Sequence, residues 1–187
     1  MRPLKLRLPE FAIYDFDQVF TTSSYYAQWQ QKPQETRQRA TEYWLQKALD
    51  DQANASHSIV CGGAVLGEIL ACPCAPLLEG IKVCLLDCYD VLRMDRITRW
   101  RFGMEVASME TLIWAGWLRM HAVDPQWWQD VIKMNSAPEM EWSRWDTWQR
   151  GDPRWEMWPL DITLLNLDET AEQLVKWINS SLPESSK

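Results

Sequence analysis

Two carboxylates follow the first apolar run of the chain. The run Phe11-Ala12-Ile13-Tyr14 ends in Asp15-Phe16-Asp17, which is typical of a buried strand that presents acidic side chains at its carboxyl end. A carboxylate pair one residue apart can share a Mg²⁺ ion or accept a proton from a hydroxyl group. The alternative is structural, with one aspartate capping the following turn and water solvating the other. The residues alone leave both interpretations open.

Basic side chains recur along one face of a predicted helix over residues 90–101. Arg93, Arg96 and Arg99 are spaced by three, so their guanidinium groups can converge on a phosphate from successive turns. The alternative is a solvated basic face whose arginines pair with the neighbouring Asp90 and Asp95. Taken alone, the spacing favours the solvated face.

Glycine is scarce, with 7 residues in 187, but one pair has the spacing of a phosphate-binding loop. Gly62 and Gly67 match G-x-x-x-x-G after a predicted strand. A P-loop needs Lys and then Ser or Thr after the second glycine. Glu68 and Ile69 stand there instead, and a carboxylate repels phosphate. We therefore interpret these glycines as part of a tight turn.

Tryptophan is abundant, with 13 residues, ten of which lie between Trp100 and Trp158. The segment 124–158 has no clear periodicity, and we expect an irregular, Trp-rich insertion or lid. Aromatic rings with interleaved arginines can stack a nucleobase. More often such a run covers a core or forms a surface for a partner. The segment therefore predicts either a cover over the core or a surface for a protein partner or for self-association.

The overall composition argues against several classes of protein. The formal net charge is −7, whereas nucleic-acid binding depends on Lys and Arg that neutralise phosphates. No apolar stretch is long enough for a membrane span or a signal peptide. The five cysteines, from Cys61 to Cys88, lack the paired spacing of a zinc site. We expect free thiols, a cytoplasmic location, and neither nucleic-acid nor membrane binding.

Short apolar runs alternate with helical segments along the chain. The predicted strands cover residues 11–14, 58–61, 81–87 and 158–163. The predicted helices cover residues 34–50, 65–70, 90–101, 104–122 and 167–179. Apolar strands separated by helices predict an α/β fold with an open, mainly parallel sheet and helices on both faces. We expect a single domain over 1–187, a last helix capped by Asp168 and a disordered tail at 181–187.

Ligands of an open parallel sheet bind at the carboxyl ends of its strands. Three features fall at such ends: Asp15 with Asp17, the turn at 61–63, and Asp87 before the arginine helix. Their order resembles the P-loop small-molecule and nucleoside kinase superfamily. More closely, it resembles bacterial kinase-like P-loop proteins that pair a D-x-D strand with a CLLD-type strand and an R-x-x-R-x-x-R helix. The resemblance covers about residues 10–180.

The resemblance implies a kinase-like protein that binds ATP, Mg²⁺ and a small phosphorylated molecule or nucleotide. The implied catalytic and Mg²⁺-binding residues are Asp15 and Asp17. The implied substrate contact is Arg37 or Arg39. The implied clamp on the donor phosphates consists of Arg93, Arg96 and Arg99, and the implied neighbours of the base are Asp161 and Thr163.

The chain departs from this family at its start. Residues 1–10 hold no glycine and supply no Walker A sequence, G-x-x-x-x-G-K-[ST]. Phosphoryl transfer depends on that cradle and its lysine, so we expect impaired kinase activity. Residues 4–8 are the segment that could fill the missing first strand.

Two other classes of function compete for the same residues. The stretch 13–21 resembles the first motif of haloacid-dehalogenase-type phosphatases, which implies Asp15 as nucleophile and Asp17 as general acid. Cys61-Gly62 stands where that family has a hydroxyl group, and Asp87 with Asp90 matches its later acidic pair only loosely. The third class is a non-enzymatic interaction module that binds a partner through its Trp-rich segment.

Overall fold

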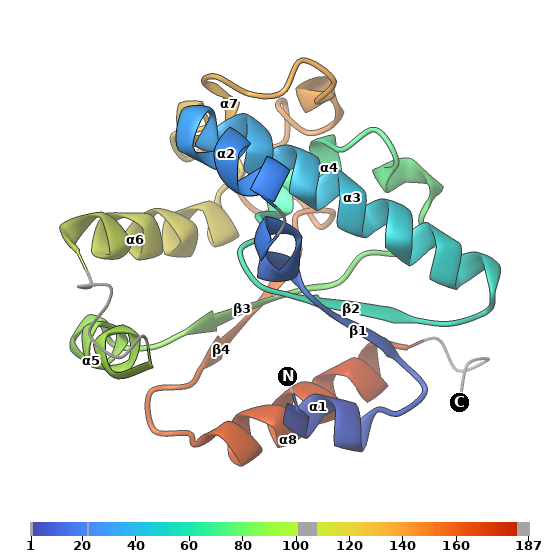
Figure 1. The fold of residues 1–187 in the computed structure, drawn as a ribbon, viewed down its shortest axis with the longest axis vertical. Helices are drawn as coiled ribbons and strands as arrows, with labels where there is room; N and C mark the ends of the chain where they lie inside the picture. Colours follow the sequence, from blue (N-terminus) through green and yellow to red (C-terminus); the bar gives the residue numbers. More distant parts are fainter. Residues whose placement is uncertain (1, 22, 101–107, 183–187) are drawn as a thin grey trace. The chain divides into compact units, whose positions relative to one another are not determined.

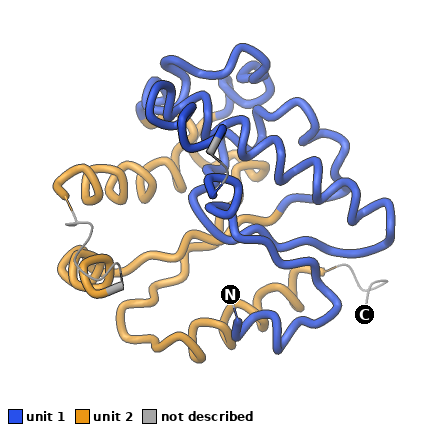
Figure 2. Tube along the Cα trace, in the orientation of Figure 1, with its two compact units in different colours: residues 1–81, 128–148 blue, residues 82–127, 149–187 orange. Residues whose placement is uncertain are grey.

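The computed structural model describes residues 2–21, 23–100 and 108–182, in which helices and short parallel strands alternate (Figure 1). The contacts gather into two compact units, each built from two stretches of chain (Figure 2). Unit 1 comprises residues 1–81 and 128–148, and unit 2 comprises residues 82–127 and 149–187. The α/β class predicted from the sequence is confirmed.

Unit 1 contains one parallel strand pair and most of the helices. Its strands are β1 (Ala12–Asp15) and β2 (Ser58–Cys61), which pair from Ala12↔Ser58 to Asp15↔Cys61. Its α-helices are α1 (Arg2–Arg7), α2 (Ser23–Gln31), α3 (Pro33–Ala53), α4 (Leu66–Ala71) and α7 (Asp130–Lys133). Its 3-10 helices are η1 (Phe16–Thr21), η2 (Ala75–Leu77) and η3 (Trp142–Arg144).

Unit 2 contains the second parallel pair. Its strands are β3 (Val83–Asp87) and β4 (Met157–Asp161), which pair from Val83↔Met157 to Asp87↔Asp161. Its helices are α5 (Asp90–Trp100), α6 (Met109–Val123) and α8 (Leu167–Ser181). The register places Asp87 and Asp161 opposite one another at the carboxyl ends of the two strands.

Three local predictions differ from the structure at the ends of the chain. Residues 4–7 belong to helix α1, so they do not form the first strand of a sheet. Helix α8 is capped by Asn166 rather than Asp168, because the Asn166 side chain accepts the N–H groups of Asp168 and Glu169 while Glu169 returns a bond to the Asn166 N–H. Ser181 still belongs to α8, and residues 183–187 lie outside the described residues.

The core of unit 1 forms where β1 runs into η1. Phe16, Val19, Ala40 and Trp44 are buried together, and the Trp44 Nε1–H donates to the Phe16 carbonyl at 3.0 Å. Gly62 follows β2 with a φ of +147°, and a Cβ there would lie 2.4 Å from Cβ of Phe16. Only glycine fits this close approach. This geometry agrees with a tight turn at Gly62, whereas Gly67, predicted to belong to the same turn, lies in helix α4.

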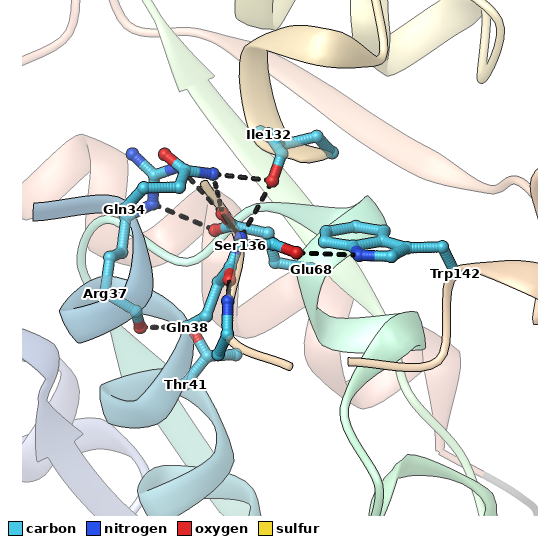
Figure 3. Close-up of polar contacts among 9 residues, drawn as sticks. Gln34, Arg37, Gln38, Thr41, Glu68, Ile132, Ser136 and Trp142 are labelled. Atoms are coloured by element: carbon cyan, nitrogen blue, oxygen red, sulfur yellow. Dashed lines mark hydrogen bonds and ion pairs between the residues drawn. The ribbon is translucent and has the colours of Figure 1, made fainter. Parts of the chain in front are cut away.

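Segment 128–148, defined here as the returning segment, is held to unit 1 by polar contacts (Figure 3). Gln34 and Gln38 of α3 donate to the Ile132 carbonyl at 2.7 and 2.8 Å, and the Gln38 Oε1 accepts the Ala137 N–H at 2.7 Å. The Arg144 guanidinium donates to carbonyls that follow α4. The segment is largely irregular, as expected, but it is attached to α3 and α4 along much of its length.

Glu68 of α4 is the centre of these contacts (Figure 3). Its carboxylate is fully buried and accepts bonds from Gln34, Arg37 and Gln38 of α3 at 2.7 to 3.1 Å. Since Gln34 and Gln38 also hold the Ile132 carbonyl, one carboxylate links α4, α3 and the returning segment. Glu68 therefore has a structural role in place of the phosphate-loop lysine.

The core of unit 2 contains a fully buried histidine. His121 stacks on Trp117 with ring centroids 4.4 Å apart, and the Trp155 ring lies at 82° to His121 with its centroid 4.9 Å away. The Trp155 Nε1–H donates to the His121 carbonyl at 2.8 Å. Burial lowers the pKa of His121 to about 4, because an imidazolium would lose its water contacts, although Asp124 opposes the shift.

We expect His121 to make unit 2 sensitive to acid. An unfolded histidine has a pKa near ~6.5, so the unfolded chain binds more protons between that pH and about 4. The stabilisation is complete above pH ~6.5 and is lost as the pH falls through about 4, with a total loss of about 3 kcal/mol. Denaturant unfolding followed by tryptophan fluorescence at several pH values measures this loss.

The His121→Phe variant is the matched control for this prediction. Phenylalanine keeps an aromatic ring against Trp117 but cannot take up a proton, and His57 is unchanged in both proteins. Carboxylates titrate equally in the two proteins, so the difference in slope belongs to His121. Equal slopes would contradict the prediction.

Candidate functional site

An open cleft lies at the carboxyl ends of β3 and β4 in unit 2. Its volume is about 340 Å³, and its lining residues are Asp87, Cys88, Tyr89, Asp90, Arg119 and Asp161. The carboxyl ends of parallel strands are where α/β proteins bind ligands, because loops and helix starts converge there. The sequence named three strand ends as candidate ligand positions, and the cleft lies at one of them, after Asp87.

Asp87 brings two arginines together. Its carboxylate accepts bonds from Arg93 of α5 and, at 2.7 Å, from the Arg119 Nε of α6. The Arg119 Nη2 also donates to the Asp90 carboxylate at 2.6 Å and to the Cys88 carbonyl at 2.9 Å. These bonds raise the pKa of Arg119 above its ordinary value, so its charge is permanent.

One donor at this site has no acceptor. The Arg93 Nε is buried and makes no hydrogen bond within the described part of the chain. The Oδ1 of Asp90 lies 3.9 Å from it, beyond hydrogen-bond distance. A buried donor without an acceptor is costly, so this nitrogen favours an additional oxygen atom near Asp90.

Arg96 connects α5 to the loop that follows β4. Its Nη2 donates to the carbonyls of Ile162, Thr163 and Leu165 at 3.0 to 3.4 Å. The Thr163 hydroxyl in turn accepts the Tyr89 N–H at 3.1 Å. Thr163 also bonds Asp161 and holds the pKa of that carboxyl below its ordinary value. The predicted set of Arg93, Arg96, Asp161 and Thr163 is therefore gathered at one strand edge.

Tyr89 gives the cleft an aromatic surface. Its side chain is 69% exposed even though its backbone is fixed by Thr163. An exposed ring beside guanidinium groups can stack a planar ligand. Tyr89 was not among the residues predicted from the sequence.

Arg99 lies apart from this set. It is 79% exposed and pairs with Asp95 at 2.8 Å, as the solvated-face alternative predicts. Arg119 was missed because it lies 32 positions from Asp87 and follows no local spacing. The available signal was its context, since Arg119 and Glu110 are the charged residues of the otherwise apolar helix α6. A lone cation on such a helix usually has an acidic partner elsewhere.

The remaining predicted residues lie in unit 1. Asp15 ends β1, and its Oδ1 accepts the Asp17 N–H at 3.1 Å, which is the turn-capping arrangement. Arg37 is held by the buried Glu68. Arg39 pairs with Glu35 and Glu139 at 2.8 and 3.0 Å and lines an open hollow of about 200 Å³ with Lys32.

Metal binding at Asp15 and Asp17 stays a prediction. Among the described residues, no group of three or more His, Cys, Asp or Glu side chains is placed to hold a metal ion. Mg²⁺ often binds through one or two carboxylates with water and ligand phosphates, and two neighbouring aspartates fit that lesser requirement.

All five cysteines are free thiols, as expected from their spacing. Burial raises the pKa of the Cys84 thiol to about 12, and burial with the Glu42 carboxylate does the same for Cys74. Thiols with such pKa values are unreactive at neutral pH.

Comparison with protein-family models, curated proteins and solved structures gave no match to this chain. Within the described ranges, none of the helices combines the length and apolar character needed to cross a bilayer. The resemblance to P-loop kinases is therefore carried by the motifs of the sequence alone.

Proposed function

We propose that the cleft of unit 2 binds a phosphate-bearing ligand of the nucleotide class. The observation that carries the proposal is the pair of guanidinium groups, Arg93 and Arg119, that converge on Asp87 at the carboxyl end of β3. Guanidinium groups bind phosphate oxygens through charge-assisted bonds, and Arg119 is the guanidinium group that lines the cleft. The exposed Tyr89 ring supplies a stacking surface for a base.

The proposal concerns binding rather than phosphoryl transfer. The 187 residues hold no G-x-x-x-x-G-K-[ST] sequence, and a kinase uses that cradle on the transferred phosphate. The same proposal includes an open parallel sheet like that of P-loop kinases. It also includes ATP and a small phosphorylated molecule as the ligands. A cytoplasmic location is part of it as well, which the free thiols support because reducing compartments keep cysteines unpaired.

Calorimetric titration with ATP and with inorganic tripolyphosphate tests this proposal. We expect Arg119→Gln to weaken both ligands by at least about tenfold, since a charge-assisted bond contributes about 1.5–3 kcal/mol. Arg119→Lys keeps the charge but loses the planar fork, so it restores part of the affinity at most. Arg99→Gln is the matched control, because it removes the same charge from an exposed position.

A second variant distinguishes the contribution of the base to the binding affinity from that of the phosphates. Tyr89→Ala is expected to weaken ATP by about tenfold, from a stacking contribution of about 1–3 kcal/mol, and to leave tripolyphosphate binding unchanged. The absence of heat with both ligands at millimolar concentration would overturn the proposed function. Equal losses in Arg99→Gln and Arg119→Gln would show that binding is nonspecific.

A further inference from the structure

The positive charge of the cleft is already matched by the chain itself. Asp87, Asp90 and Asp161 line it, whereas Arg119 is the single arginine among its lining residues. An incoming phosphate therefore meets no surplus of positive charge. To reach Arg119, it has to replace a carboxylate of the protein.

Asp90 is the carboxylate that can leave most easily. It is the first residue of α5, and its side chain is 45% exposed, whereas that of Asp87 is 28% exposed and held by two arginines. Asp161 accepts its bonds from Thr163, and no arginine pairs with it among the described residues. A rotation of the Asp90 side chain frees one N–H of the Arg119 Nη2 without moving a strand, while the bond of Nη2 to the Cys88 carbonyl remains.

The Asp90 carboxylate also fits its position incompletely. Its Oδ1 lies 2.6 Å from the Arg119 Nη2 but 3.9 Å from the Arg93 Nε, which stays without an acceptor. A phosphate has more oxygens, a larger radius and a higher charge than a carboxylate. One phosphate could therefore bond to Arg119 at the position that the Asp90 carboxylate now occupies.

We propose that Asp90 is a built-in competitor, whose carboxylate occupies the phosphate position on Arg119 and is displaced when ligand binds. This inference rests on the proposed function, because it concerns the same cleft. It makes affinity depend on the exchange of an internal anion for an external one. The aspartate is then an autoinhibitory contact, and neutralising it strengthens binding.

The test is calorimetric titration of Asp90→Asn with tripolyphosphate in buffer without Mg²⁺. We expect an affinity about tenfold higher than that of the unmodified protein, because a like charge next to the ligand is removed. Asp95→Asn is the matched control, since it removes one negative charge from the same helix at the exposed pair with Arg99. Its affinity should change less than about twofold.

The unfolding midpoint is measured on the same proteins. Asp90→Asn loses an ion pair, so we expect its unfolding midpoint not to rise. Its affinity for tripolyphosphate should rise nevertheless. A purely structural role of Asp90 would not produce this combination. If Asp90→Asn binds tripolyphosphate no more tightly than the unmodified protein, Asp90 does not compete with the ligand. The proposed function would still stand. Absence of binding in both proteins would overturn the proposed function, and the inference with it. Binding by Asp90→Asn alone would support both.

Discussion

Replacing Glu68 with alanine is expected to lower the free energy of unfolding of unit 1 by about 3–5 kcal/mol, the cost of removing one partner of a buried ion pair. The Arg37 guanidinium is mostly buried and would lose two bonds to carboxylate oxygens. Gln34 and Gln38 would lose an acceptor as well. Chemical denaturation, with hydrogen exchange of the α3 amides to report on unit 1, measures the loss.

Two variants control for this prediction. Glu68→Gln keeps the shape and one carbonyl acceptor, so its loss should be smaller than that of alanine. Glu139→Ala removes a partner of Arg39 from an exposed pair, and such pairs contribute about 0–1 kcal/mol. If Glu68→Ala is no less stable than Glu139→Ala, the buried carboxylate does not hold the returning segment to α3.

Trp145→Ala is expected to destabilise unit 1 by a similar amount, about 3–5 kcal/mol, through the cavity that it leaves. Trp145 is fully buried, its Nε1–H donates to the Gly67 carbonyl at 2.8 Å, and Trp142 packs against it edge-on. The loss of this indole removes the apolar contact between the returning segment and α4. The shift of the denaturation midpoint measures it.

Trp128→Ala is the matched control for Trp145→Ala. The Trp128 side chain is 75% exposed in the same unit, and exposed substitutions usually change stability by less than about 0.5 kcal/mol. The two variants also separate packing from partner binding. A complex weakened by Trp128→Ala at unchanged stability would support a partner surface, whereas Trp145→Ala would weaken any complex simply by unfolding the segment. Equal stabilities of the two variants would contradict the packing role of Trp145.

The strands were predictable because each is a short apolar run, closed by aspartate in β1, β3 and β4 and by glycine after β2. The predicted strand 58–61 matches β2 at both ends, 81–87 contains β3, and 11–14 and 158–163 overlap β1 and β4 with shifted ends. Helix α1 was not predictable in this way, because Leu4, Leu6 and Leu8 alternate with basic residues as in a half-buried strand. Residues Arg2–Arg7 form the local hydrogen bonds of a helix instead.

The site was predictable only in the part that is local in sequence. Arg93 and Arg96 share a face of α5 with a spacing that the sequence displays, and Asp161 with Thr163 follows a recognisable strand. The contact of Arg119 with Asp87 spans 32 positions, and that of Arg96 with Thr163 spans 67. Glu68 is buried in an ion pair with Arg37, and its partners on α3 come from 30 to 34 positions away.

The interleaving of the two units determines the order in which a ribosome can complete them. The Gly67 carbonyl and the Trp145 indole that binds it are 78 residues apart, and the first part of unit 2 is synthesised between them. At about 5–20 residues per second, their meeting is delayed by roughly 4 to 16 seconds. During that interval the nascent α3 and α4 expose the surface that the returning segment later covers. Neither unit can finish folding during translation before part of the other has emerged.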